Sequence, residues 1–146
     1  MDKKWLNYRE GTYTNFAAGL EPDGFKEIKW GQRLSTVLGM KEDKTYSSES
    51  DTNDFYKRDN EDLTIKDARI NRIVYFFPEG RFCAAFAIAH GIDNFKALRK
   101  ELIDEYGNNG AFTESICFWF GYRCVVKLRY EASSDLVILE INHHKC

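Results

Sequence analysis

Proline, long apolar runs and an excess of one charge sign are all scarce or missing in this sequence. Only 2 of the 146 residues are proline and 10 are glycine, which excludes a collagen-like or low-complexity chain. No window approaches the roughly 20 apolar residues of a membrane-spanning helix. The 21 basic and 23 acidic side chains leave a net charge of -2, so no global basic field attracts nucleic acid. These absences argue against a membrane or a nucleic acid as the main partner.

The start of the sequence has no unbroken apolar stretch of about 7–15 residues, as a secretory leader requires. Trp5 and Leu6 are followed at once by polar and charged side chains. The length predicts one domain, because domains typically have about 100–150 residues. We therefore expect a cytoplasmic protein with an N-terminal extension at 1–23 and a single α+β domain at 24–146.

The cysteines are few and are not spaced as a metal or redox motif. None of the four forms a Cys-x-x-Cys pair, which argues against a zinc ribbon or a thioredoxin-like site. In a reducing compartment we expect all of them to be free thiols, three of them buried as small apolar groups. The four are Cys83, Cys117, Cys124 and Cys146.

Signatures of common enzymes and metal sites are also absent. The sequence has no glycine-rich phosphate loop, no His-Glu-x-x-His and no Gly-x-Ser-x-Gly. A nucleophile pair of His90 with Cys117 or Cys124 could form only through tertiary folding. We therefore predict no catalytic residue and no cofactor.

Two segments carry metal-ligating side chains without the pattern of a metal site. The run from Asp51 begins like a calcium loop, but Phe55 stands where an oxygen ligand belongs and Tyr56 where the turn glycine belongs. His143 and His144 are adjacent, so on a strand they would point to opposite faces, and we expect a frayed tail there. No metal site is predicted.

After residue 62 the sequence contains several segments whose side-chain pattern predicts β-strands. Residues 70–77 are rich in β-branched and aromatic side chains, and the turn signal Pro78-Glu79-Gly80 precedes a second strand at 81–90. Small side chains line one face of this second strand, which lets a helix lie close to the sheet. They are Cys83, Ala85, Ala87 and Ala89. Further strands are predicted at 116–120, 122–130 and 136–141.

Two helices are predicted, one long and one short. An apolar stripe with spacings of three and four residues predicts a helix over 93–106, with Asp93 as its N-cap and Gly107 at its end. A shorter helix is predicted at 34–38. Because helices are few and do not alternate with strands, the fold class is α+β. We expect a mostly antiparallel β-sheet with one long and one short α-helix packed on one face.

The first part of the chain gives weaker patterns. A faint alternation predicts a strand at 25–30. The acidic segment 41–62 is expected to form a solvated hairpin or loop, with weak strands at 45–48 and 54–58.

The most distinct surface feature that the sequence predicts is a row of basic side chains. Along 122–130 the side chains alternate, which is typical of a sheet with one wet face, and the basic residues share that face. With a tryptophan on the neighbouring strand they could form a platform for an anionic or stacking ligand. The alternative is a solvated face whose cations pair with the acids of 41–62. The candidate binding residues are Trp119, Arg123, Lys127 and Arg129.

Several aromatic and glycine residues form a spaced pattern that is spread thinly over 25–141. The positions are Phe25, Ile28, Trp30-Gly31, Gly80-Arg81-Phe82, Phe95, Leu98 and Tyr106-Gly107, and none is chemically reactive. This pattern resembles a loose group of small uncharacterised bacterial α+β proteins, whose members often look exported. The resemblance implies a compact α+β domain and carries no catalytic residue to this chain.

High aromatic content without a reactive cluster favours a non-enzymatic ligand-binding or protein-interaction module. We expect self-association as a homodimer, through an edge strand or an aromatic patch. One alternative is a small enzyme with its site between the sheet and 41–62. A second alternative is a weak nucleic-acid binder that uses the basic and aromatic sheet face.

Overall fold

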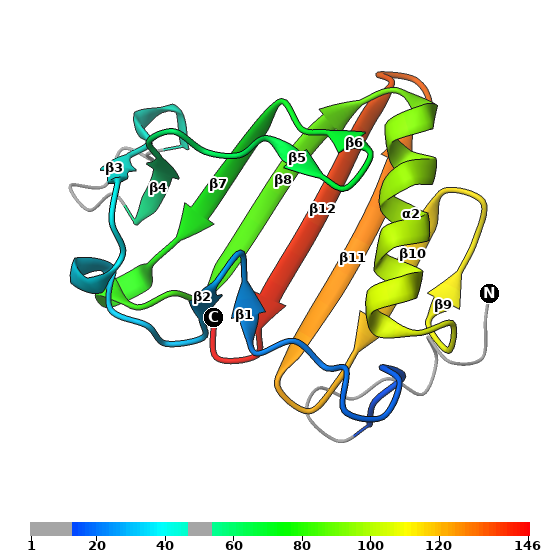
Figure 1. Cartoon of the computed structure of the whole chain (residues 1–146), viewed down its shortest axis with the longest axis horizontal. Coiled ribbons are helices and arrows are strands. Elements are labelled where there is room, and N and C mark those ends of the chain that lie inside the picture. Colours follow the sequence, from blue (N-terminus) through cyan, green and yellow to red (C-terminus); the bar gives the residue numbers. More distant parts are fainter. Residues whose placement is uncertain (1–12, 47–53) are drawn as a thin grey trace.

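The computed structural model describes residues 13–46 and 54–146, and its centre is an eight-stranded antiparallel sheet (Figure 1). The strand order across the sheet is β3-β4-β7-β8-β12-β11-β10-β9. This confirms the α+β class with an antiparallel sheet. The strands are β3 (Met40–Glu42), β4 (Phe55–Arg58), β7 (Arg72–Phe76), β8 (Ala84–His90), β9 (Ala111–Phe112), β10 (Ile116–Phe120), β11 (Cys124–Glu131) and β12 (Leu136–His143).

The long helix α2 (Ile92–Tyr106) packs on one face of the sheet, as the apolar stripe predicted. Its buried side chains are Phe95, Leu98, Leu102 and Tyr106. Gly107 follows the helix with a φ of 95°, so the predicted end is confirmed. The predicted N-cap is wrong: Gly91 takes that position and Asp93 lies in the first turn, where its charge suits the helix dipole. Across 13–46 and 54–146 no helix has both the length and the apolar character needed to cross a membrane.

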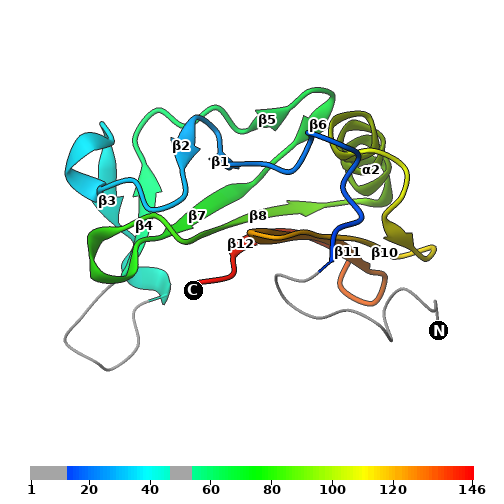
Figure 2. The same ribbon diagram turned by 90° about the horizontal axis from the view of Figure 1, so that it is seen from below.

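Two small hairpins lie on the same side of the sheet as α2 (Figure 2). They are β1 (Gly24–Phe25) with β2 (Ile28–Lys29), and β5 (Thr64–Ile65) with β6 (Ala68–Arg69). Together with α2 they cover the alanine-lined face of β8, whose Ala85, Ala87 and Ala89 are buried as predicted. The predicted β7–β8 hairpin is confirmed, with a 3-10 turn η3 (Pro78–Gly80) between the strands.

The predicted strand at 25–30 is instead the tight β1–β2 hairpin. Lys26 and Glu27 form its turn with φ values of 46° and 72°. Gly24 permits this close return of the chain, since a Cβ there would lie 1.9 Å from the main-chain oxygen of Ile28. The weak alternation could not distinguish one strand from two short ones.

The predicted short α-helix at 34–38 is also wrong. The chain forms a single 3-10 turn, η1 (Leu34–Thr36), and Leu38 is 87% exposed. So short a segment has too few hydrogen bonds to compensate for helix nucleation.

The acidic segment forms a hairpin at its base, where β3 pairs with β4. The predicted strand at 54–58 is confirmed as β4. Of the predicted strand at 45–48, residues 45 and 46 belong to the 3-10 turn η2 (Lys44–Tyr46). The remainder, and the start of the calcium-like run at Asp51, lie outside the described residues.

The structure corrects the prediction of four free thiols and of a frayed tail. Cys83 and Cys146 form a disulfide with a Cα–Cα distance of 5.5 Å, whereas Cys117 and Cys124 are unoxidised and buried. Strand β12 runs beside β8 with Asn142 opposite Ala84, which brings the chain end next to Cys83. The main-chain N–H of His144 also donates to Arg123 O at 2.8 Å.

Residues 13–23, within the predicted N-terminal extension, lie against the end of the sheet. The Asn15 main-chain N–H donates to Phe120 O at 2.9 Å, and Asn15 Oδ1 accepts from Phe120 N at 2.7 Å. The Glu21 carboxylate accepts from the main-chain N–H groups of Tyr122 and Arg123 at 2.7 and 2.8 Å. This segment therefore satisfies polar groups at the β10–β11 turn.

Candidate functional site

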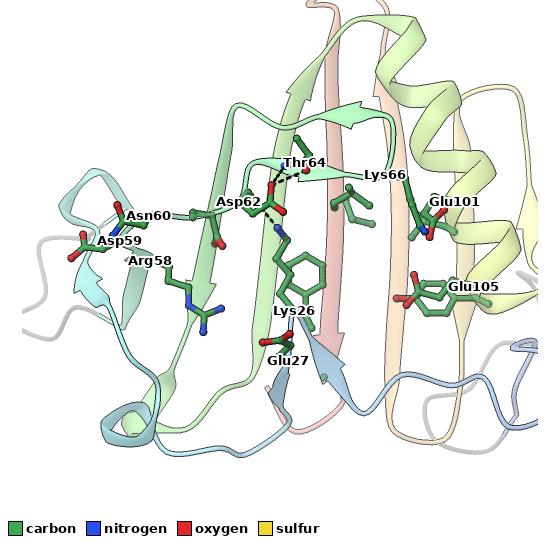
Figure 3. Close-up of a pocket in the computed structure, with 17 residues that line it drawn as sticks. Lys26, Glu27, Arg58, Asp59, Asn60, Asp62, Thr64, Lys66, Glu101 and Glu105 are labelled. Atoms are coloured by element: carbon green, nitrogen blue, oxygen red, sulfur yellow. Dashed lines mark hydrogen bonds between the residues drawn. The ribbon is translucent and has the colours of Figure 1, made fainter.

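A cleft of about 610 Å³ lies on the covered side of the sheet (Figure 3). Three segments that are distant in the sequence form its walls. They are the β1–β2 hairpin, the stretch from Arg58 to Lys66, and the second half of α2. The volume lies in the range of typical small-molecule sites, about 300–1,000 Å³.

The floor of this cleft is apolar. Leu102 from α2 and Leu139 from β12 are buried there, with Phe25 and Ile65 beside them. Tyr106 also lines the cleft and is only 5% exposed, and its ring packs edge-on against Phe16 and Trp119. An apolar ligand surface could therefore displace water from this floor.

The hydroxyl of Tyr106 is buried without a hydrogen bond to any described residue. Burial raises its pKa, and the nearby Glu105 raises it further, so the phenol stays neutral. A buried polar group without a partner costs stability. Since Tyr106 lines the cleft, a ligand or a water molecule there could supply the missing hydrogen bond.

The rim of the cleft is charged and predominantly acidic. It holds six carboxylates against three cations, although the whole chain has a net charge of only -2. The carboxylates are Glu27, Asp59, Glu61, Asp62, Glu101 and Glu105, and the cations are Lys26, Arg58 and Lys66. A ligand with a positive charge would be attracted to this rim.

Glu101 and Glu105 lie one helical turn apart on the side of α2 that faces the cleft (Figure 3). Like charges at this spacing destabilise a helix. Partial burial raises the pKa of Glu105, the charge of Glu101 raises it further, and Lys66 opposes both. A cationic group between the two carboxylates would relieve this repulsion.

Lys26 connects the hairpin tip to the opposite wall. Its ammonium group donates to the main-chain oxygen of Asp62. The Asp62 carboxylate accepts from Thr64 Oγ1 at 2.7 Å and from Thr64 N at 3.1 Å, and these bonds lower its pKa, with a smaller contribution from Lys26. The β1–β2 hairpin is thereby fixed across the mouth of the cleft.

The Glu61 carboxylate is bound by Tyr75 of the sheet strand β7. The Tyr75 hydroxyl donates to Glu61 Oε1. Tyr75 is fully buried, and burial followed by the Glu61 charge raises its pKa, whereas Arg58 acts in the opposite direction. The rim carboxylate of Glu61 is therefore fixed in place by a bond to the core.

The predicted platform of Trp119 with three cations is not formed. Trp119 is completely buried on the helix side of the sheet, and its Nε1–H donates to Gly107 O at 3.0 Å. In the register of β10 and β11 the partner of Lys127 is Phe118, whereas Trp119 faces Val126. Because side chains alternate along a strand, Phe118 is the aromatic residue that shares a face with the cations.

The three predicted cations are not gathered at one site either. Arg123 lies in the β10–β11 turn with a side chain 55% exposed, and its Nε is 3.2 Å from Glu21 Oε2. Lys127 and Arg129 lie on the sheet face opposite α2, where Arg129 pairs with Glu131 of the same strand. None of the three lines the cleft.

Other predicted chemical groups are separated in the structure. His90 lies near Asn71, with its Nδ1 2.9 Å from Asn71 Oδ1. Burial raises the pKa of Cys117 to about 11 and that of Cys124 to about 12, so both remain thiols and are poor nucleophiles. Across 13–46 and 54–146, no three histidine, cysteine or carboxylate side chains are grouped to hold a metal ion.

No protein-family model, curated protein or solved structure matches this chain.

Proposed function

We propose that this protein is a non-enzymatic binding module whose cleft takes a small amphipathic molecule with a cationic group. The observation that carries the proposal is the combination of an apolar floor with a rim of six carboxylates and three cations. Binding sites for small molecules typically combine an apolar surface with a few placed polar groups.

The geometry suggests how such a ligand would lie. Its apolar part would cover the half-buried Phe25 and Ile65, beneath which Leu102 and Leu139 are already buried. Its cation would lie between Glu101 and Glu105, whose mutual repulsion favours a positive group there. The buried Tyr106 hydroxyl would give a hydrogen bond to a polar atom along the ligand.

A small enzyme with a site beside 41–62 would use the same cleft, because residues 58–62 line it. Thr64 and Asp62 are the hydroxyl and carboxylate that contact each other there, at 2.7 Å. The lowered pKa of Asp62 makes it a weak base, which leaves the hydroxyl without activation. This supports binding rather than catalysis.

Isothermal titration calorimetry with matched probes tests the proposal. We expect octylammonium to bind, whereas octanoate, which has the same chain length, and tetramethylammonium, which has no chain, bind much more weakly. In the double variant Glu101→Gln/Glu105→Gln the affinity for octylammonium should fall by about tenfold, which corresponds to about 1.4 kcal/mol.

Glu114→Gln is the matched control, because Glu114 is exposed and does not line the cleft. Its affinity for octylammonium should equal that of the unchanged protein. Equal binding of octanoate and octylammonium, or a double variant that binds as well as the control, would contradict the proposal.

We propose separately that the protein resides in an oxidising compartment. Disulfides persist in oxidising compartments and are rare in the reducing cytosol. The Cys83–Cys146 disulfide therefore supports an oxidising compartment over the predicted cytoplasmic location. Alkylation of the protein taken directly from its cells tests this: Cys83 and Cys146 should resist the reagent unless a reductant is added first. Immediate alkylation of both would favour the cytoplasm.

A further inference from the structure

We propose that the cleft takes a linear polyamine, with a cationic nitrogen at each end of the chain and one between them. This inference rests on the proposed function and narrows its cationic ligand to one chemical class. Three observations carry it: a second cavity that adjoins the cleft, carboxylates in both cavities, and the buried hydroxyl of Tyr106, a residue that lines both.

The second cavity has a volume of about 270 Å³. Its lining residues come from the chain between Leu20 and Lys29 and from the end of α2. It shares residues 24–27 and 105–106 with the cleft, so the two cavities meet between the β1–β2 hairpin and α2. Its volume lies below the range of about 300–1,000 Å³ for a complete small-molecule site. The second cavity therefore suits one end of a ligand whose remainder lies in the cleft.

Carboxylates lie in both cavities. Glu101 lines only the cleft, Asp23 lines only the second cavity, and both Glu27 and Glu105 line the two. Figure 3 shows Glu27 on the hairpin and Glu105 on α2, in two separate walls of the cleft. Asp23 and Glu27 are exposed, and neither carboxylate forms an ion pair or a hydrogen bond with another residue of the described ranges. A ligand with one cation at Glu101 and Glu105 can therefore place a second one in the cavity beside Asp23.

Two lysines also line the second cavity, but they do not reverse its charge. The ammonium group of Lys26 donates to the main-chain oxygen of Asp62, on the opposite wall of the cleft. Lys29 is exposed on β2. Three carboxylates outnumber the two lysines in this cavity. Since a wall with an excess of carboxylates attracts positive charge, a cationic end of a ligand is favoured there over an anionic one.

The Tyr106 hydroxyl accounts for a nitrogen between the two ends. Tyr106 is 5% exposed, lines both cavities, and has no hydrogen-bond partner within 13–46 and 54–146. A buried polar group without a partner costs stability, and a phenol oxygen can accept as well as donate. The charge of Glu105, the preceding residue of α2, acts on this phenol, so a carboxylate lies close to it. A cationic nitrogen here would donate to the Tyr106 oxygen with the Glu105 charge nearby.

The methylene segments of a polyamine match the apolar surface in these cavities. Phe25 lines both cavities and is half-buried, so part of its side chain is accessible to a ligand. A cationic nitrogen over an aromatic ring is attracted to the ring face. An alkyl monoamine would cover the same surface, but it would leave Asp23 without a cation and the Tyr106 hydroxyl without a partner. The arrangement therefore favours a chain that carries several cationic nitrogens.

Isothermal titration calorimetry with three probes of matched chain length tests the proposal. Octylammonium has one nitrogen, octamethylenediamine has a second at the far end, and spermidine has the same length as the diamine with a nitrogen in place of one interior methylene. We expect octamethylenediamine to bind several-fold more tightly than octylammonium, and spermidine more tightly again. Octylammonium that binds as well as both polycations would overturn this inference and leave the proposed function standing. If none of the three binds, the proposed function fails as well.

Two substitutions that keep the shape of the side chain assign the contacts. Asp23→Asn should remove most of the advantage of octamethylenediamine over octylammonium, and Tyr106→Phe should remove the advantage of spermidine over octamethylenediamine. Asp104→Asn is the matched control, because Asp104 is exposed on α2 and lines neither cavity. It should keep the order of the three affinities. Variants at Asp23 and Tyr106 that both keep this order unchanged would overturn the proposal.

Discussion

Glu105 connects the stability of α2 with the cleft. Its pKa is raised above the ordinary value of 4.5 by partial burial and by Glu101. The folded state therefore binds this proton more tightly than the unfolded state does. The resulting stabilisation is fully present below the unfolded pKa and is lost as the pH rises through the folded pKa.

Replacing Glu105 by Gln should remove this pH dependence. Between acid and neutral pH the unchanged protein should lose more stability than Glu105→Gln does, because the variant has no carboxylate to ionise there. Melting temperatures of both proteins, measured from pH 4 to neutrality, provide the check. If the melting temperatures of the two proteins changed in parallel over this range, burial and Glu101 would not raise the pKa of Glu105.

The sequence pattern alone could not decide which face of β10 carries the Trp119 side chain. Both neighbours of Trp119, Phe118 and Phe120, are aromatic, so composition alone gave no reason to prefer one face of β10. The register with β11 decides it, because Trp119 lies opposite the buried Val126. The pairing of Lys127 with Phe118 follows from that register and was not visible beforehand.

At the scale of elements, the long periodic segments were predictable and the short ones were not. Helix α2 and the strands β7, β8, β11 and β12 each repeat one pattern over five or more residues. The β1–β2 and β5–β6 hairpins have strands of two residues. Contacts with the sheet and with α2, rather than local preference, determine such short elements.

The contribution of α2 can be measured by two substitutions on opposite sides of the helix. Leu98 is completely buried, so Leu98→Ala should lower the free energy of unfolding by about 2–5 kcal/mol through lost burial and a cavity. Lys100 is exposed, and Lys100→Ala should change it by less than about 0.5 kcal/mol. Urea denaturation of the two variants gives the comparison. Equal midpoints would contradict the packing of α2 on the sheet.

At the scale of the whole molecule, the cleft joins segments that are far apart in the sequence. The hairpin tip at 26–27, the wall at 58–66 and the carboxylates at 101 and 105 meet only after the sheet has formed. The sequence indicated that the acidic segment 41–62 could border a site, and its last five residues do line the cleft. Nothing in the sequence indicated that Glu101 and Glu105 line a cleft, because an acidic pair on a helix normally faces water.

The disulfide has the same non-local origin. Cys83 and Cys146 are 63 residues apart, and only the pairing of β12 with β8 brings them together. Sequence reasoning predicted both strands but not their adjacency. Three cysteines are buried, as predicted, but of these only Cys117 on β10 and Cys124 on β11 are free thiols.

The most direct test of the ligand cleft is a map of amide chemical shifts during titration with octylammonium. We expect the largest changes at Lys26, Asp62 and Glu105, which lie on the three walls of the cleft. Octanoate should leave these signals in place. Changes confined to the sheet face opposite α2, or no localised changes at saturation, would contradict the assignment of the cleft as the binding site.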